Sequence, residues 1–402
     1  MRIEPSRKAA SIVAFAISLS LCACMGNTHV EETLGGFTGC GNNCPPSPEF
    51  LYATSNDHIS AFTVDHSTGA LGAPLAMAGP NQSLGMVASV TLGHLFVSDF
   101  LSGSVDGFSV NLTSGGLTPI TGSPFLVGST APGAGGLSNV VPGSVYLYAT
   151  DLNDGTVAGF TFDSASGKLM PVPGSPFPAG NSPVQAARDY LGKFLFVSNY
   201  NDSAGGISAF TIDQNTGALS PILGSPFPTG PTGSYPGPSA MVVNNNFLYV
   251  ALAGTSSANN RIVAFAIDPT TGVLTTLPSS PFVTGSDPLY IAFVAVTNVG
   301  FQAFLYTANV QDGTISAFTA DDNTGVLTPV NGSPYPAGTS VGGLATSLTF
   351  TASGNYFLYA ADPQASNING FIINGNTGQL SPIAGSPFAA GNSPALLTVL
   401  VP

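Results

Sequence analysis

The sequence contains no tryptophan and few charged residues, and positive charge is especially scarce. Its 402 residues include seven Lys or Arg against twenty Asp or Glu, which gives a formal net charge of −13. Proteins that bind nucleic acid contact its phosphates through clustered Lys and Arg, and anionic membrane surfaces attract the same side chains. The composition therefore excludes a nucleic-acid partner and electrostatic attachment to a membrane.

Low charge does not indicate disorder here, because 44% of the residues are hydrophobic and fall in short runs typical of buried strands. The one longer apolar run, residues 9–21, follows Arg2, Arg7 and Lys8. It is too short for a comfortable membrane span. A basic start followed by such a run is typical of an export signal.

Residues 21–24, Leu-Cys-Ala-Cys, resemble a bacterial lipobox. The resemblance predicts a signal peptide over residues 1–24, with Cys24 as the lipid-modified N-terminus. The alternative is ordinary cleavage nearby, with Cys22 and Cys24 removed or unused. Met25 is not Asp, and by resemblance to Gram-negative lipoproteins this favours the outer membrane. We therefore expect an exported protein, lipid-anchored in the bacterial cell envelope and in contact with the membrane only through that lipid.

Residues 25–48 are rich in Gly, Asn, Pro and Thr, and we expect them to form a flexible tether. They contain the remaining two cysteines, Cys40 and Cys44. In an exported protein the expected state of such a pair is a disulfide, and free thiols are the alternative. A zinc site would need two more ligands, and only His29 lies near in the sequence.

The rest of the chain consists of seven copies of one repeat. In the copy at residues 184–227, three short apolar runs lead to a turn that Asp213 can cap and Gly217 can close. A fourth run, residues 218–223, is stopped by Gly-Ser-Pro. The turn glycine recurs at Gly69, Gly115, Gly167, Gly217, Gly272, Gly325 and Gly378. The second run recurs at residues 50–53, 94–97, 146–149, 194–197, 247–250, 304–307 and 357–360.

Four strands per repeat with two apolar faces indicate a small sheet covered on both sides, as in a propeller blade. A stacked array would need capping repeats at its ends, and none is visible. The first repeat begins at its second strand, whereas an extra apolar run, residues 394–401, follows the last repeat. We therefore expect an all-β fold over residues 49–402. Seven four-stranded antiparallel blades would be closed by the C-terminal strand, which completes the first blade.

The strands FLYVA, FLFVSN and YLYATD, with the following ISAFTID-like strands and DxxTGxL turns, resemble those of the seven-bladed lactonase family. This family includes the 6-phosphogluconolactonase-like and YVTN-repeat propellers. The resemblance covers residues 50–402. It implies the propeller architecture and the opening of a sugar lactone by an activated water.

The groups that such catalysis needs are not found at matching positions. Lactone hydrolysis requires a general base and a donor for the developing oxyanion. We expect no histidine on a first strand, where side chains would line the central channel: His29 lies in the tether, His58 in a loop, His66 in a turn and His94 at the start of a second strand. Arg261 is the one cation expected on the ligand-facing loops. Arg188 is expected on the opposite face, paired with Asp189 or solvated.

Acidic residues recur in the loops between second and third strands. Six of the seven blades contribute: Asp57, Asp99, Asp151, Asp154, Asp202, Asp312 and Asp362. Together with Arg261 they are the candidate binding residues. Such a rim could bind calcium, which takes several carboxylate and carbonyl oxygens. The alternative is that Asp, with Asn and Gly, simply forms the turns. Either way the rim would repel an anionic substrate such as phosphogluconolactone.

A Gly-Ser-Pro-Phe motif follows most fourth strands. Its aromatic positions are Phe125, Phe177, Phe227, Phe282, Tyr335 and Phe388. They could form a stacking surface for glycans, or they could pack at the blade junctions while the proline blunts the sheet edge. One aromatic residue per blade at a fixed position favours packing.

Two functions remain open at this point. The favoured one is a non-catalytic, monomeric module that binds a small molecule, glycan, peptide or protein on its acidic loops, with calcium as the one candidate cofactor. The alternative is a lactonase that acts on an uncharged or cationic lactone. Two carboxylates and a donor converging in the channel would favour the enzyme, and a channel lined by backbone, Ser, Thr and small apolar residues would favour binding.

Overall fold

The computed structural model describes residues 48–80, 82–89, 93–128, 132–138, 145–201, 206–230, 237–254, 260–296, 302–347 and 356–400. These residues form β-strands and no helix, so they contain no helix long and apolar enough to cross a membrane. The predicted signal peptide and tether, with Cys24, Cys40 and Cys44, lie outside the described residues, as does Asp202.

The strands form seven antiparallel sheets, named blades 1 to 7, in which the first strand lies innermost. Blade 1 comprises β34 (Leu397–Leu400), β1 (Glu49–Thr54), β2 (His58–Val64) and β3 (Leu75–Ala78). Blade 2 comprises β4 (Met86–Ser89), β5 (His94–Asp99), β6 (Ser104–Val110), β7 (Leu117–Pro119) and β8 (Phe125–Leu126). Blade 3 comprises β9 (Ala134–Leu137), β10 (Tyr146–Asp151), β11 (Thr156–Phe162), β12 (Leu169–Pro171) and β13 (Phe177–Pro178). Blade 4 comprises β14 (Pro183–Arg188), β15 (Phe194–Asn199), β16 (Gly206–Ile212), β17 (Leu219–Pro221) and β18 (Phe227–Pro228).

The remaining three blades repeat this arrangement. Blade 5 comprises β19 (Gly237–Asn244), β20 (Phe247–Ala253), β21 (Arg261–Ile267), β22 (Leu274–Thr276) and β23 (Phe282–Val283). Blade 6 comprises β24 (Pro288–Val296), β25 (Gln302–Asn309), β26 (Thr314–Ala320), β27 (Leu327–Pro329) and β28 (Tyr335–Pro336). Blade 7 comprises β29 (Leu344–Ser347), β30 (Tyr356–Asp362), β31 (Asn367–Ile373), β32 (Leu380–Pro382) and β33 (Phe388–Ala389).

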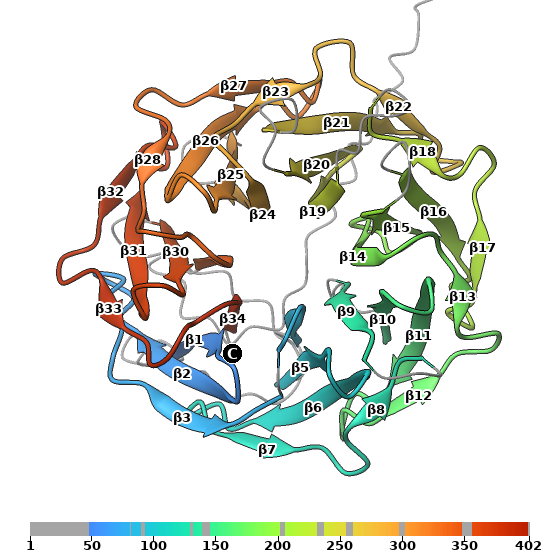
Figure 1. Cartoon of the computed structure of the whole chain (residues 1–402), viewed down its shortest axis with the longest axis horizontal. Coiled ribbons are helices and arrows are strands. Elements are labelled where there is room, and N and C mark those ends of the chain that lie inside the picture. The colour runs from blue at the N-terminus through green and yellow to red at the C-terminus, as the bar shows by residue number, and fades with distance from the viewer. Residues whose placement is uncertain are drawn as a thin grey trace, which may run out of the picture. The chain divides into compact units, whose positions relative to one another are not determined.

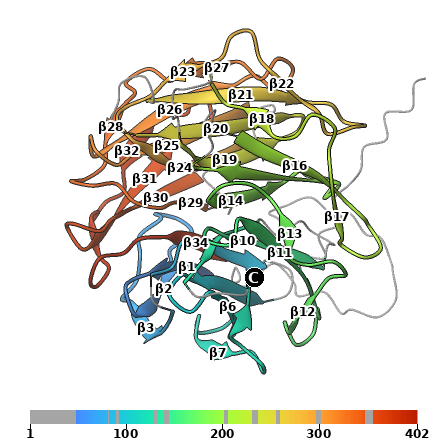
Figure 2. The same cartoon turned by 45° about the vertical axis from the view of Figure 1, so that its right-hand side comes forward.

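The blades follow one another around a closed ring (Figure 1). First strands of successive blades are in contact all the way round: β4 with β9, β9 with β14, β14 with β19, β19 with β24, β24 with β29, β29 with β34, and β34 with β4. Figure 2 shows the strands of blades 5 and 6 stacked from β19 and β24 outward to β22 and β27. The seven-bladed prediction is confirmed.

The ring closes through the C-terminal strand, as predicted. Strand β34 pairs antiparallel with β1, with Leu400 opposite Phe50 and Leu397 opposite Ala53. The last strand of the chain therefore supplies the first strand of blade 1, and the polypeptide ends inside the blade in which the propeller begins.

The second strands are buried on both faces because each blade is covered by two neighbours. In β1, Phe50, Leu51, Tyr52 and Ala53 are all fully buried. Between blades 3 and 4, side chains of β10, β11 and β13 pack with those of β14, β15, β16 and β17 in one apolar cluster. The core is thus a set of inter-blade layers.

Tyrosines of the second strands bond to turn glycines of the next blade. The Tyr52 hydroxyl donates to the Gly115 carbonyl at 2.9 Å, and Tyr359 in blade 7 donates to Gly69 in blade 1 at 2.7 Å. Three more such bonds join Tyr148 to Gly217, Tyr249 to Gly325 and Tyr306 to Gly378. Burial raises the pKa of Tyr359 well above its ordinary value, so the phenol remains a donor. The Tyr359 bond spans the closure of the ring.

The outer edge of blades 2 to 7 is made of two short strands, where one fourth strand was expected. In blade 4, β17 pairs with the end of β16 and β18 pairs with its beginning. Between them the Ala209 N–H donates to Ser225 Oγ at 2.9 Å, while the Ile222 N–H donates to the Ala209 carbonyl at 2.9 Å. The serine of the Gly-Ser-Pro motif, which precedes a cis proline, thus replaces a missing ladder partner.

The motif's aromatic residues pack between blades. Phe125 and Phe177 are buried in the clusters of blades 2–3 and 3–4. The other four, which are half-buried, pack against equivalent clusters: Phe227, Phe282, Tyr335 and Phe388. The packing interpretation is confirmed.

Candidate functional site on the loop face

The connections between second and third strands emerge at one end of the blades, which we call the loop face. Its described loops are residues 55–57, 100–103, 152–155, 310–313 and 363–366. The segments that enter the first strands reach the same end, because first and second strands are antiparallel. The turns carrying the repeated glycines lie at the opposite end, the turn face.

Three of the predicted acidic residues, Asp99, Asp151 and Asp362, accept N–H groups within their own loops. Asp99 Oδ1 accepts the N–H groups of Leu101 and Ser102 at 3.0 and 3.1 Å. Asp362 is buried and accepts the N–H and hydroxyl of Thr339. These contacts are those of turn and loop-holding residues.

Asp57 and Asp312 are not brought next to another of the predicted acidic residues. Asp57 is exposed and lies 2.7 Å from Nδ1 of His58, measured from its Oδ1. Asp312 Oδ2 accepts the Ser286 N–H at 2.5 Å. His58 is the first residue of β2, not a loop residue as expected, because the strand begins as soon as the three-residue loop ends.

Asp151 differs from these residues because one of its carboxylate oxygens is buried without a hydrogen-bond partner. It ends β10 and is fully buried. Its Oδ1 accepts the N–H groups of Asn153 and Asp154, both at 3.0 Å. Its Oδ2 is buried without any hydrogen bond. Burial raises the pKa of Asp151, since desolvation disfavours the charged form, and the nearby Asp154 adds to the shift.

Asp154 brings a second carboxylate to the same place. A Cβ built on Gly128 would lie 1.9 Å from Asp151 Oδ2 and 2.9 Å from Asp154 Oδ2, so the two oxygens converge on one small volume. Gly133 also faces Asp151, with its Cβ position 2.4 Å from Oδ1. A side chain at either position would collide with these oxygens, so the glycines let the backbone pack directly against the carboxylates. Asp151 and Asp154 are the only predicted loop-face acids that the described structure brings together.

Equivalent positions in other blades show why this carboxylate is unusual. Asn199 and Asn309 end the second strands of blades 4 and 6, and each donates its amide N–H to hydroxyl groups of the next strand. Their amide oxygens are also buried without partners. A neutral amide oxygen costs far less to bury than a carboxylate does.

The first strands of blades 2 to 5 enclose a cavity of about 250 Å³. Its walls are apolar except for Gln185 and Arg188: Met86, Val87, Leu137, Ala186, Ala187, Met241, Val242 and Val243. Gln185 accepts the Met241 N–H through Oε1 at 2.5 Å. No histidine of the described chain lies on a first strand, as predicted.

Arg188 lies at the turn-face end of its strand, as expected, and it is buried near the charge of Asp189 rather than solvated. It is the last residue of β14, 2% exposed, and its Nη1 donates to the Tyr146 carbonyl at 2.9 Å. The guanidinium lies 5.7 Å from the centre of the Tyr148 ring. Burial lowers its pKa. Arg188 therefore serves blade packing and is not available to an anionic ligand on the loop face.

Arg261 opens β21 at the loop face, as predicted, and is half-buried. Strand β21 pairs with β20 on one side and with β23 on the other. Among the described residues no group of three or more His, Cys, Asp or Glu side chains is placed to hold a metal ion. A cation on the loop face would thus depend on two carboxylates and on backbone oxygens.

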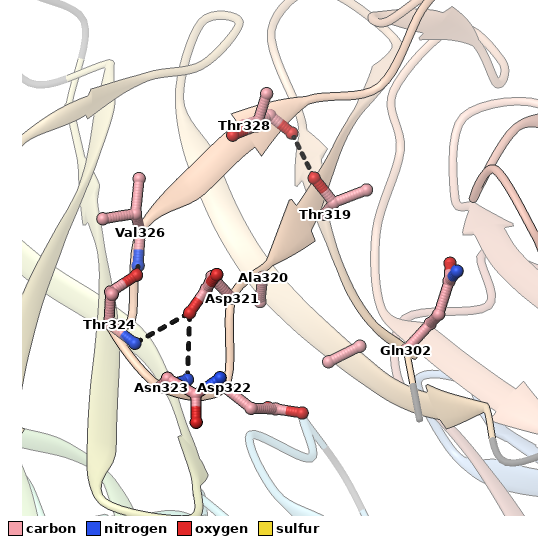
Figure 3. Close-up of a pocket in the computed structure, with 10 residues that line it drawn as sticks. Gln302, Thr319, Ala320, Asp321, Asp322, Asn323, Thr324, Val326 and Thr328 are labelled. Carbon is pink, nitrogen blue, oxygen red and sulfur yellow. Dashed lines mark hydrogen bonds between the residues drawn. The ribbon is translucent and has the colours of Figure 1, made fainter. Parts of the chain in front are cut away.

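A larger hollow, about 790 Å³, lies on the turn face of blade 6 (Figure 3). Asp321 accepts the N–H groups of Asn323 and Thr324 there. Asp322 accepts the Asn244 amide at 2.6 Å, and burial raises its pKa. Sequence reasoning did not single out this hollow. Its signal is the doubled aspartate, since the other turns carry a single acid or none.

The sequence matches the model of the family described as "Lactonase, 7-bladed beta-propeller" over residues 45–232 and 202–327. The chain belongs to the seven-bladed β-propeller lactonase family. No curated protein matches the sequence.

Solved structures agree with this family at low identity. The periplasmic gluconolactonase of Pseudomonas aeruginosa is 18% identical, with a TM-score of 0.67, covering 89% of this chain and 100% of that one. A candidate 6-phosphogluconolactonase of Bacteroides fragilis is 17% identical, with a TM-score of 0.65 over 88% and 98%. A Lactobacillus plantarum protein is 14% identical, with a TM-score of 0.68 over 88% and 99%. These likenesses establish the fold, and the chemistry has to be argued from the site.

Proposed function

We propose that this lactonase-family propeller opens an uncharged lactone by hydrolysis on its loop face, with the Asp151–Asp154 pair activating the attacking water. The observation that carries the proposal is the convergence of the two carboxylate oxygens, one of them buried without a hydrogen bond. Carboxyl groups with displaced pKa values in such settings are typical of sites that handle protons. Family membership supports the same reaction class.

The distribution of charge supports an uncharged or cationic substrate. Of the four basic residues in the blades, Arg188 is buried, while Lys168 and Lys193 lie beside the turn-face ends of β12 and β15. Arg261 alone lies at the loop face, among several aspartates. A phosphorylated lactone would meet repulsion there without a compensating cluster of cations. The Pseudomonas neighbour is described as a gluconolactonase, without mention of phosphate.

The test is hydrolysis of glucono-δ-lactone and of its 6-phosphate by the full chain, followed by proton release. We expect turnover of the uncharged lactone and a much lower kcat/KM for the phosphate ester. Asp154→Asn should lower kcat/KM by about 10²–10⁴, the range of general-base contributions. Asp312→Asn, which alters an acid in the corresponding loop of blade 6, is the matched control and should change it less than about twofold. Equal loss in both variants, or none in Asp154→Asn, would contradict the proposal.

The non-catalytic binding module is the second candidate, and the apolar wall of the central cavity favours it. It would bind a glycan, peptide or protein on the loop face. Calorimetric binding of glucono-δ-lactone or an oligosaccharide by the full chain, with no turnover of any lactone in a broad panel, would support this function. Turnover that depends on Asp154 would exclude it.

A further inference from the structure

We infer that Asp151 and Asp154 together bind one hard divalent cation of the calcium class. The catalytic role of this cation rests on the proposed function, whereas the binding site itself does not. It lies in blade 3, between the end of β10 and Gly128. The proposal narrows the sequence expectation of an acidic rim to two residues of one loop.

The first step is the need to neutralise Asp151. Its side chain is fully buried, its Oδ1 is bonded to two backbone N–H groups, and its Oδ2 has no donor. A buried carboxylate without a partner is strongly unfavourable, so the site must take up either a proton or a cation.

The second step favours a cation over a lone proton. The Oδ2 atoms of Asp151 and Asp154 both face the Cβ position of Gly128, and Gly133 faces Oδ1. Two converging carboxylates supply oxygen ligands of the kind that calcium takes, and its flexible coordination shell is completed by backbone carbonyls and water. A proton would neutralise one carboxylate and leave the second beside it.

The third step is the contrast with the other blades. Asp362 occupies the same strand position in blade 7, but Thr339 and Ala365 donate hydrogen bonds to its two oxygens. Asn199 and Asn309 are neutral at this position. Among the described second strands, only that of blade 3 therefore ends in a buried carboxylate with an open oxygen, and we expect one cation per chain.

A cation here would give the proposed reaction its activated water. Water bound to a divalent cation is more acidic than free water, and the cation can polarise a carbonyl oxygen. In the part of the chain that the structure describes, no first strand carries a histidine that could activate the water instead.

The experiment is calorimetric titration of the full chain with CaCl2 after treatment with EDTA, together with thermal unfolding in EDTA and in millimolar calcium. We expect one calcium per chain and a higher midpoint of unfolding with calcium, because the ion binds the native state. Asp154→Asn should weaken calcium binding at least about tenfold. Asp312→Asn, the control, should leave the affinity unchanged within about twofold.

The variant Asp151→Asn distinguishes a bound cation from a bound proton as the group that neutralises Asp151. With a cation site, this variant loses both calcium binding and the calcium-dependent rise in the midpoint. Absence of any calcium, magnesium or manganese binding by the unsubstituted chain at millimolar concentration overturns the inference. So does binding that neither substitution weakens.

The inference and the proposed function can fail separately. Lactone hydrolysis that persists in EDTA and is lost in Asp154→Asn would uphold the function and overturn the cation as its agent. One calcium bound at Asp151 and Asp154 without hydrolysis of any lactone would uphold the site and overturn the function.

Discussion

At the scale of single residues, the repeated glycines have two roles, of which the sequence revealed one. The need for a positive φ in the turns was predicted, and all seven turn glycines have φ between +71° and +75°. The second role is close packing. The ring of Phe247, which opens β20, lies where a Cβ of Gly325 in the next blade would be. The sequence could not show this contact, because it joins residues of different repeats.

Gly325→Ala should therefore destabilise the propeller by more than backbone strain alone. Left-handed backbone costs a residue with a side chain about 1–2 kcal/mol. The new Cβ would also approach Phe247 to 2.5 Å, so we expect a total loss above ~2 kcal/mol, measured by urea unfolding. Gly116→Ala is the control, since that half-buried glycine has no positive φ and its Cβ would approach only the Ser114 hydroxyl. Equal effects in the two variants would refute the packing role.

The candidate site shows the same limit at residue scale. The sequence indicated acidic loops, and Asp99 and Asp362 accept N–H groups of their own loops, as turn residues do. The pairing of Asp151 with Asp154 was not predictable. The sequence of this loop is the same whether the two carboxylates point apart or converge. A glycine from another segment approaches the equivalent strand end in blades 4, 6 and 7 too, and what distinguishes this loop is that two aspartates meet there.

At the scale of elements, the outer edge of each blade is where prediction and structure differ most. Residues 218–223 were expected to form one fourth strand, but β17 covers only Leu219–Pro221 and a separate β18 follows. The serine between them completes the hydrogen bonding of β16 through its hydroxyl group. The same bond recurs in all six blades that carry the motif. A side chain that replaces a strand partner leaves no periodic pattern in a sequence.

Ser225→Ala should destabilise blade 4, because it leaves the N–H of Ala209 buried without an acceptor. The expected loss is about 1–3 kcal/mol, the cost of an unsatisfied buried donor. Chemical denaturation of the full chain measures it. Ser220→Ala, at an exposed position of β17, should cost less than about 0.5 kcal/mol. If the two losses are the same, the hydroxyl does not complete the strand.

At the scale of the whole molecule, the architecture was predictable from the sequence, but the hydrogen bonds between blades were not. Seven repeats, apolar on both faces, with a missing strand at one end and a spare one at the other, allowed only one simple closure. The tyrosine bonds that tie blade to blade, including Tyr359 to Gly69 across the closure, were not visible. They depend on which repeat follows which in space.

Removing residues 394–402 should open the ring. Strand β1 would lose its partner β34, and Phe50 and Leu51, now fully buried, would border the gap. We expect the midpoint of thermal unfolding to fall by more than about 10 °C, or the chain to become insoluble, because closure couples all seven blades. Removal of residues 401–402 alone, beyond β34, is the control and should leave the midpoint nearly unchanged. If the truncated chain and the unmodified chain unfold at the same midpoint, the ring is stable without its C-terminal strand.

The broken outer edges also bear on how the protein behaves at high concentration. With only 7% charged residues, the protein has few charged side chains with which to protect the outer edges of its sheets. An unbroken outer strand on every blade would offer other chains seven rows of free amides on which to grow a fibril. Two- and three-residue strands that end in proline, such as β17 and β18, offer no such row. In blades 2 to 7 the geometry of the outer edge therefore works against cross-β association.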